Sequence, residues 1–245
     1  MKQFVENMLV WERNLFFRLN GSDSALLDNI MHVVSTKEMW IPLYLFIAFL
    51  VFFRTRISQS ALVFFSFILV AALADQFSSG LIKPIFERLR PGHHPDFREY
   101  VQLFTSTYMT ESGEVGVRFH RGGGFAFISG HATNHTAFAV LLSLIFRNRW
   151  ATLVSLFWAG LISYSRVYLG VHFVSDIIGG IIAGTLIAMA VYYLALVPLR
   201  KKLLKLDDSE KYQMYSAQHG KILWIGFAIY FAVALYATTT YLGSF

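Results

Sequence analysis

Long apolar stretches separated by short polar segments make up most of this chain. They occupy residues 40–53, 57–82, 132–146, 150–164, 177–199 and 222–245. A helix satisfies its own backbone hydrogen bonds, so such stretches can cross the hydrocarbon core of a bilayer as helices. The first stretch is short for a span by itself, and Trp40 and Tyr44 near its start suit an anchor at the membrane interface.

The first twenty residues have a different pattern, that of an amphipathic helix. Phe4, Trp11 and Leu15 recur at helical spacing, whereas charged residues interrupt any run long enough to span. We expect this helix to pack on the bundle or to lie in the membrane interface, with docking of a partner protein as the alternative. A turn at residues 20–24 then leads to a short second helix.

The composition indicates a membrane protein. Hydrophobic residues make up 56% of the chain and charged residues only 15%, against about 25% in soluble domains. The chain has no cysteine, which excludes disulfides and thiol catalysis. We expect no cleavable signal peptide, because the first twenty residues lack an uninterrupted apolar segment followed by a small-residue cleavage site.

The basic residues between the apolar stretches predict the orientation of the chain. They concentrate in loops that lie on one side of the membrane if all the stretches cross it, and by the positive-inside rule that side is cytoplasmic. The net charge of +6 is therefore a topology signal, and no motif for binding nucleic acid is present. The loop residues are Arg54, Arg56, Arg147, Arg149, Arg200, Lys201, Lys202, Lys205 and Lys211.

The predicted fold is all-α, a polytopic membrane bundle of about six transmembrane helices preceded by the amphipathic helix. The whole chain, 1–245, forms a single domain. Its parts are N-terminal interfacial helices (1–37), the first two spans (38–82), an extracytoplasmic active-site loop (83–130), the catalytic spans (131–199), a basic cytoplasmic loop (200–220) and a last span (221–245).

Three polar blocks lie where apolar stretches end, all on the non-cytoplasmic side of this topology. The first contains Lys83 and Arg90, each followed by a proline. Their spacing of seven residues, two helical turns, would place both on one helical face. Arginine suits bidentate binding of phosphate and lysine supplies a point charge, although cations at the end of an apolar run can also simply snorkel to the interface.

The second block, Ser129-Gly130-His131, directly precedes an apolar stretch. If His131 lies in the first turn of that helix, free backbone N–H groups point at any anion beside it. Ser129 could cap the helix and donate to the same anion. The alternative is a purely structural histidine, and the three glycines at 122–124 suggest a flexible turn.

The third block contains Arg166, His172 and Asp176. His172 and Asp176 are four residues apart, so a helix places the imidazole and the carboxylate on one face. A carboxylate that accepts from Nδ1–H fixes the tautomer and leaves Nε2 free as a nucleophile. Charged groups at membrane depth indicate a functional site by default.

Together the blocks resemble the three-part signature of the type-2 phosphatidic acid phosphatase family, which includes vanadium haloperoxidases. The patterns K-x6-R-P, S-G-H and S-R-x5-H-x3-D are present, but Ile128 replaces the proline that usually precedes S-G-H. The resemblance implies covalent catalysis without a metal or cofactor. In that mechanism His172 attacks phosphorus to form a phosphohistidine, Asp176 orients His172, and His131 acts as general acid. The resemblance assigns phosphate binding to Lys83, Arg90, Arg166, Ser129 and Gly130.

Other polar residues have less certain roles. Asp75, inside an apolar stretch, needs a partner, so it could pair with a site cation, face a water-filled cleft or hold two helices together. His135 follows His131 by one helical turn and could line the same cleft. Two histidines and an aspartate at 93–96 lack the spacing of a metal site, so we expect a solvated loop and no metal. His120 and Arg121 could contact a substrate head group.

The sequence therefore predicts a multi-pass phosphatase in a bacterial cytoplasmic (inner) membrane, with its site facing the periplasm or the cell exterior. The expected substrate is an amphiphilic phosphate monoester or diphosphate, such as undecaprenyl diphosphate, lipid A phosphate or phosphatidylglycerol phosphate, with vanadate or phosphate as inhibitors. The long segment 92–130 favours a polyprenyl diphosphate or lipid A phosphate. The alternatives are a non-catalytic phosphate- or lipid-binding membrane protein and a vanadate-dependent haloperoxidase.

Overall fold

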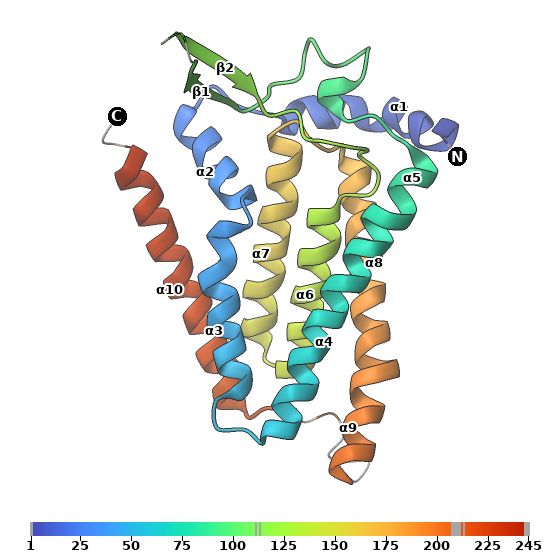
Figure 1. Ribbon diagram of the computed structural model, residues 1–245, viewed down its shortest axis with the longest axis vertical. Coiled ribbons are helices and arrows are strands. Elements are labelled where there is room, and N and C mark those ends of the chain that lie inside the picture. The colour runs from blue at the N-terminus through green and yellow to red at the C-terminus, as the bar shows by residue number, and fades with distance from the viewer. Residues whose placement is uncertain (1, 111, 113, 207–211, 213, 243–245) are drawn as a thin grey trace.

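Helices that run along one axis form the body of the molecule (Figure 1). The computed structural model describes residues 2–110, 112, 114–206, 212 and 214–242. The apolar stretches form helices at the predicted places, which confirms the all-α class. These helices are α3 (Ile41–Phe52), α4 (Ile57–Asp75), α6 (Gly130–Phe146), α7 (Arg149–Tyr168), α8 (Val174–Ala190) and α10 (Ala217–Leu242).

Two of these helices continue through π-helical segments. Helix α4 passes through η2 (Gln76–Ile82) into α5 (Lys83–Phe86), and α8 passes through η4 (Val191–Leu196) into α9 (Val197–Leu204). Because the hydrogen-bonded helix does not end at these segments, each apolar stretch is extended rather than broken.

Fewer helices are long and apolar enough to span a membrane than the six predicted. In the described part of the chain, Ile57–His93, Val174–Leu204 and Ala217–Thr240 are long and apolar enough to cross a membrane. The helix pair Ala25–Ser35 and Glu38–Phe52, bent by 70°, would be a fourth span. Helices α6 and α7 are not long and apolar enough by the same measure, although they run beside the others in the bundle.

The sequence suggested that the first apolar stretch is a separate, short helix. In the structure it instead continues from preceding helical turns. Helix α2 (Ala25–Ser35), capped by Ser24, leads through the short η1 (Glu38–Trp40) into α3. Trp40 is only 1% exposed and donates its indole N–H to the Val34 carbonyl at 2.9 Å. The prediction that Trp40 anchors the interface is therefore wrong, because the helical bend turns its side chain into the core.

Helix α1 (Lys2–Leu19) lies across one end of the bundle (Figure 1). It buries Leu9, Glu12 and Phe16 against the bundle and exposes Phe4 and Trp11. The helix therefore packs on the bundle as expected, but through a different face, because Phe4, Trp11 and Leu15 of the predicted apolar face are exposed. One member of the buried face is a carboxylate, which is unusual for a packing face and requires a partner.

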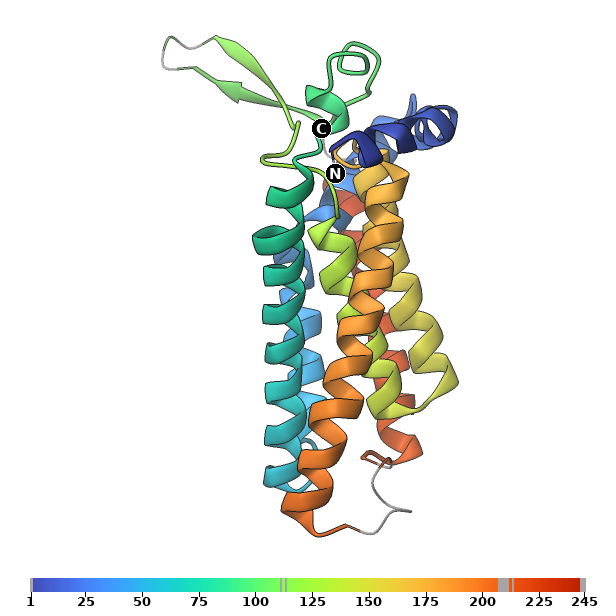
Figure 2. The same cartoon turned by 90° about the vertical axis from the view of Figure 1, so that its right-hand side faces the viewer.

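A β-hairpin projects beyond the same end of the bundle (Figure 2). Strands β1 (Thr105–Met109) and β2 (Val115–Phe119) pair antiparallel. The hairpin corrects the prediction that residues 83–130 form one loop. Its strands are mostly exposed, so they lack the alternation of buried apolar and exposed polar residues that predicts a strand.

The two ends of the bundle carry different chemistry. The loops between α3 and α4 and between α6 and α7, together with α9, lie at one end, whereas α5, the start of α6 and the turn between α7 and α8 lie at the other (Figure 1). The basic loops therefore lie together, opposite the three polar blocks, as predicted. Lys211, part of the predicted basic loop, lies outside the described residues.

Two glycines allow α6 and α8 to approach each other closely. A Cβ atom on Gly184 would lie 2.4 Å from the Thr133 carbonyl oxygen, and one on Gly180 would lie 2.8 Å from the Ser129 carbonyl oxygen. Small residues four apart are typical of close helix contacts in membranes. Since Asp176 lies one turn before Gly180, this contact determines how far the second polar block lies from the third.

We expect Gly184→Ala to destabilise the protein by about 1–3 kcal/mol, because the added methyl group overpacks this contact. Gly160→Ala on α7 is the matched control, since a Cβ atom there meets nothing within 4 Å and alanine favours helix. The measurement is thermal unfolding in detergent, followed by circular dichroism. Equal unfolding temperatures for the two variants would show that the contact between α6 and α8 does not require glycine.

Candidate active site

The residues of the three polar blocks meet at the end of the bundle that α1 and the hairpin cover. The Nη1 atom of Arg90 lies 3.2 Å from Nε2 of His172, which joins the first block to the third. The backbone N–H of Ser129 donates to the Asp176 carbonyl at 3.0 Å, which joins the second block to the third. The convergence expected from the sequence is therefore present. Three cations contribute to this cluster, here called the site cations: Lys83, Arg90 and Arg166.

His172 lies in the turn between α7 and α8 and is 1% exposed. Its Nδ1 atom lies 3.3 Å from Oδ2 of Asp176, while its Nε2 atom faces Arg90. A guanidinium group can only donate, so Nε2 carries the lone pair and Nδ1 the proton. Burial, followed by the positive charges of the site cations, lowers the pKa of His172 well below 6.5. The imidazole is therefore neutral at neutral pH, as a nucleophile must be.

Asp176 holds this tautomer in place from the first turn of α8. The carboxylate is fully buried, and its Oδ2 atom also accepts the backbone N–H of Phe173 at 2.8 Å. This bond satisfies one of the free N–H groups at the start of the helix, as a capping carboxylate does. The helix start therefore fixes the carboxylate, and the carboxylate fixes the imidazole.

Lys83 and Arg90 do not share a helical face, which corrects the sequence prediction. Helix α5 ends at Phe86, and Glu87 adopts a left-handed conformation with φ of 47°. Pro91 follows Arg90, and a residue before proline is biased toward an extended conformation; Arg90 has φ of −74° and ψ of 157°. The chain therefore turns back over the site, and Arg90 approaches His172 from a loop.

Backbone carbonyls hold the Arg90 guanidinium in position. Its Nε atom donates to the carbonyls of Gly123 at 3.0 Å and Gly124 at 3.2 Å, and Nη1 donates to Val171 at 2.9 Å. Gly122 has φ of +71°, and a Cβ atom there would lie 2.9 Å from Nη1. The glycine segment predicted as a flexible turn is thus a support for Arg90, and glycine allows its close approach.

The start of α6 contributes the second block. Ser129 is the N-cap, and its Oγ atom accepts from the Ala132 N–H at 3.4 Å. A Cβ atom on Gly130 would lie 3.4 Å from Ser78 Oγ, 3.8 Å from Ser79 Oγ and 3.9 Å from Lys83 Nζ. Two serine hydroxyl groups and one site cation therefore surround the start of this helix, where backbone N–H groups favour an anion. The sequence analysis missed both serines, which lie in η2.

Arg166 lies near the end of α7 and borders a small outer chamber. Its Nη1 atom donates to Ser35 Oγ of α2, but its buried Nε atom has no hydrogen-bond partner among the described residues. The chamber has a volume of about 180 Å³ and is also lined by His32 and His120. His120 accepts from or donates to Ser106 Oγ at 2.8 Å. The chamber therefore places polar side chains beside Arg166, whose Nε–H group can donate to a ligand.

His131 lies in the first turn of α6, as predicted, within electrostatic range of Arg166 and His172. Its ring is parallel to that of His135, with centroids 6.0 Å apart. The Nδ1–H of His135 donates to the His131 carbonyl at 2.8 Å. His135 therefore lies beside the site, on the side that leads into the bundle.

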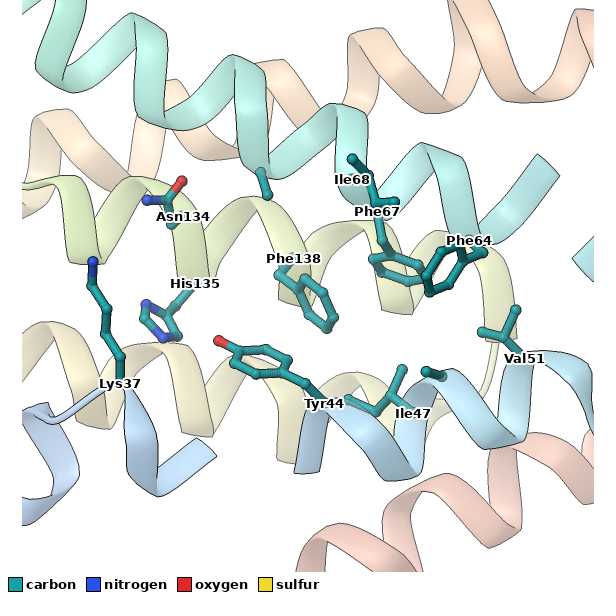
Figure 3. A pocket seen from close by; sticks show the side chains of 12 residues that line it. Lys37, Tyr44, Ile47, Val51, Phe64, Phe67, Ile68, Asn134, His135 and Phe138 are labelled. Carbon is teal, nitrogen blue, oxygen red and sulfur yellow. The ribbon is translucent and has the colours of Figure 1, made fainter. Parts of the chain in front are cut away.

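An apolar pocket of about 430 Å³ begins at His135 and lies between α3, α4 and α6. Lys37, Asn134 and His135 lie at one end of this pocket, and aromatic and aliphatic side chains fill the other (Figure 3). His135 thus lines a mainly apolar pocket whose lining does not include His131, so the expectation that the two histidines line the same cleft stays a prediction. The apolar lining consists of Tyr44, Ile47, Ala48, Val51, Phe64, Phe67, Ile68, Ala71 and Phe138.

Asp75 is exposed on α4 and lies within electrostatic range of the site cation Lys83, although its carboxylate makes no hydrogen bond or ion pair with any described residue. Its role therefore stays a prediction. The prediction for the histidines that follow Pro91 needs correction. His94 does not lie in a solvated loop, because it is 7% exposed and its Nε2 atom lies 3.1 Å from Glu6 of α1. His93 remains exposed, and the described residues contain no cluster of three metal-ligating side chains.

Sequence reasoning also missed two charged residues that the structure buries beside the site, Arg88 and Glu12. Arg88 donates to Asp176 Oδ1 at 2.7 Å and pairs with Glu12. A signal for Glu12 was present, since it lies at helical spacing between Leu9 and Phe16 on the apolar face of α1. Arg88 gave no such signal, because loop residues have no periodicity.

Comparison with known proteins identifies the family. The sequence model of the PAP2 superfamily matches residues 61–200, more than half of the chain, and this region contains all three polar blocks. A lipid A 4'-phosphatase of Porphyromonas gingivalis is 38% identical over 77% of this chain and 74% of its own. A second lipid A 4'-phosphatase, from Bacteroides thetaiotaomicron, is 31% identical over 74% of each chain. An undecaprenyl-diphosphatase of Sulfolobus acidocaldarius is 29% identical over 71% of this chain and 73% of its own. The protein whose three polar blocks converge around His172 therefore belongs to the PAP2 superfamily of phosphatases.

Proposed function

We propose that this membrane lipid phosphate phosphatase removes a phosphate group from the head group of a lipid A-type glycolipid, through a phosphohistidine at His172. The observation that carries the proposal is the orientation of His172. Its Nδ1–H faces the buried Asp176 carboxylate at 3.3 Å, and its Nε2 lone pair faces a guanidinium at 3.2 Å. A nucleophile directed at a cationic anion-binding group suits attack on a phosphate.

In the first step, the substrate phosphate draws Arg90 away from the His172 lone pair by accepting its N–H groups. Nε2 then attacks phosphorus in line, and the bond from phosphorus to the leaving oxygen breaks with its electron pair on that oxygen. His131 donates the proton that the leaving oxygen requires. In the second step, His131 takes a proton from water, the water oxygen attacks phosphorus, and inorganic phosphate leaves as His172 is regenerated.

The site cations stabilise the negative charge of the transferring phosphoryl group. Phosphoryl transfer depends chiefly on positioning and on electrostatic stabilisation of the equatorial oxygens. Besides Arg90, the equatorial oxygens can accept from the Lys83 ammonium, the Gly130 N–H and the Arg166 Nε–H, which has no partner among the described residues. Ser129 fixes the start of α6. Asp176 stabilises the positive charge that His172 acquires when Nε2 bonds to phosphorus.

The apolar pocket beside His135 supports an amphiphilic substrate. Its polar end lies at the site and its aromatic end lies between α3 and α4 (Figure 3), so it suits one alkyl chain of a lipid whose head group faces the site cations. Burial of an alkyl chain contributes about 0.8 kcal/mol per methylene group. A water-soluble phosphate ester would gain none of this energy.

Two features favour a lipid A phosphate over the other candidates. The two more similar relatives described above are both lipid A 4'-phosphatases, whereas the undecaprenyl-diphosphatase is less similar. The outer chamber between His32, His120 and Arg166 offers polar groups that a sugar head group can bind. Undecaprenyl diphosphate, with its single polyprenyl tail and no sugar, is the second candidate.

The proposed location is the inner membrane of a bacterium, with the site at the periplasmic face and residues 1–245 as one catalytic domain. The arrangement of charges supports this orientation, because the basic loops lie at the opposite end of the bundle from the site. A reporter enzyme fused after Lys205 should therefore report a cytoplasmic position.

The function is tested by measuring phosphate release from purified lipids by the detergent-solubilised protein. We expect release from lipid A to exceed release from undecaprenyl diphosphate, phosphatidylglycerol phosphate and phosphatidic acid. His172→Gln should reduce the rate by about a thousandfold or more, because it removes the nucleophile, while substrate binding persists. The exposed His93→Gln is the matched control and should retain activity. Equal activity of His172→Gln and the wild type would indicate a different mechanism.

We expect orthovanadate to inhibit this activity and EDTA to leave it unchanged. Vanadate resembles the five-coordinate phosphorus of the transition state, so it should bind His172 and the site cations. A mechanism with histidine as nucleophile requires no metal to activate water. The measurement is phosphate release with each reagent in turn, and strong inhibition by EDTA would overturn the metal-free mechanism.

We expect Gly122→Ala to raise KM about tenfold, the equivalent of one charge-assisted hydrogen bond. The new methyl group would lie 2.9 Å from Arg90 Nη1 and displace the guanidinium. Gly124→Ala is the comparison variant, since Gly124 also has positive φ, +66°, but a Cβ atom there meets nothing within 4 Å. Identical KM values for the two variants would mean that crowding of Arg90 has no effect on substrate binding.

A further inference from the structure

A line of buried charges connects α1 to the nucleophile. Glu12, Arg88 and Asp176 are 0%, 1% and 0% exposed. The Nη2 atom of Arg88 bonds to Oε1 of Glu12, and Nη1 bonds to Oδ1 of Asp176 at 2.7 Å. Asp176 in turn bonds to His172 through its other oxygen. Glu12 is thus linked through two intermediate groups to the imidazole that attacks phosphorus.

Ser175 connects Glu12 and Arg88 to the start of α8 by hydrogen bonds. Its backbone N–H donates to Glu12 Oε2 at 2.7 Å and its hydroxyl group donates to Oε1 at 2.8 Å. The same hydroxyl oxygen accepts from Arg88 Nη1 at 2.6 Å. Glu12 therefore supplies, from another helix, a carboxylate for the N-terminus of α8, where the helix dipole favours negative charge.

The charges of this line determine what Asp176 can do for His172. A guanidinium bonded to Asp176 alone would neutralise the carboxylate and weaken its stabilisation of a cationic imidazole. Glu12 balances Arg88, so the three groups together retain one net negative charge beside His172. In a buried site this charge acts at low effective dielectric, where electrostatic effects are large.

A purely structural role would not require ions here. Burying a salt bridge costs desolvation energy, and well-packed apolar side chains can often replace one without loss of stability. The apolar face of α1 already packs through Leu9 and Phe16. A buried carboxylate between them is therefore better explained by the charge that it supplies.

We propose that Glu12 is a positioning residue for phosphoryl transfer, which acts through Arg88 to hold Asp176 charged and directed at His172. This inference rests on the proposed function, because it assigns the charge to stabilisation of the phosphohistidine. It gives α1, which lies across the outer end of the bundle, a part in the chemical step.

The test is the variant Glu12→Gln in the full-length protein, which removes the charge and retains the shape. We expect kcat to fall about tenfold to a hundredfold, the size of loss seen when a group that orients a metal-ligating histidine is removed. KM should change less than twofold, about 0.4 kcal/mol, because the site cations are untouched, whereas vanadate, which binds His172 as a transition-state analogue, should inhibit more weakly in proportion to the loss of kcat. A loss of fold alone would instead reduce the amount of active protein and leave kcat per active site unchanged.

Glu6→Gln is the matched control. Glu6 lies on the same helix and its carboxylate, 35% exposed, contacts His94 rather than Arg88. Its kcat should equal that of the wild type. Arg88→Gln and the double variant Glu12→Gln/Arg88→Gln complete a cycle, and the losses in kcat should be strongly non-additive because the two residues act on one path.

A folded Glu12→Gln with wild-type kcat would overturn the proposal, and so would additive losses in the cycle. If Glu12→Gln does not fold, Glu12→Asp replaces it, since it keeps the charge but shortens the side chain and so withdraws the carboxylate from Arg88. A reduced kcat at unchanged KM then supports the proposal, and a wild-type kcat overturns it. A wild-type protein that releases no phosphate from any lipid would instead refute the proposed function, so the two failures are distinguishable.

Discussion

The buried carboxylate of Asp176 is the group on which the rest of the site depends. Oδ2 accepts from His172 and from the Phe173 backbone, and Oδ1 accepts from Arg88. A buried carboxylate without such donors would be strongly destabilising or would take up a proton. The start of α8, the loop after α5 and the N-terminal helix are each held where they are because each contributes one of these interactions or supports a group that does.

A second constraint is the mutual repulsion of the site cations. Lys83, Arg90 and Arg166 lie close enough for their charges to interact, and carbonyl groups partly compensate for this, notably those of Gly123 and Val171 beside Arg90. Neutral dipoles can hold a cation without cancelling its charge. The site therefore stays electropositive and preorganised for a multiply charged oxyanion, which differs from a site neutralised by fixed carboxylates.

The sequence predicted what local patterns and spacing can encode. Apolar stretches placed the helices of the bundle, and four-residue spacing placed His172 beside Asp176. Prediction from the sequence failed where the surroundings of a residue come from segments distant along the chain. Trp40 belongs to a bend that buries it, and Arg90 reaches the site from a loop rather than a helix. Arg88 and Glu12 could not be paired in advance, because 76 residues separate them and no short-range rule connects them.

The bond between the Ser175 backbone and Glu12 spans 163 residues of sequence, and this separation has a consequence for biosynthesis. A chain that emerges from the N-terminus cannot complete the charge arrangement around the imidazole until α8 has emerged and entered the bilayer. If Glu12 acts as proposed, chains that have not yet inserted α8 would therefore lack the complete charge arrangement around His172.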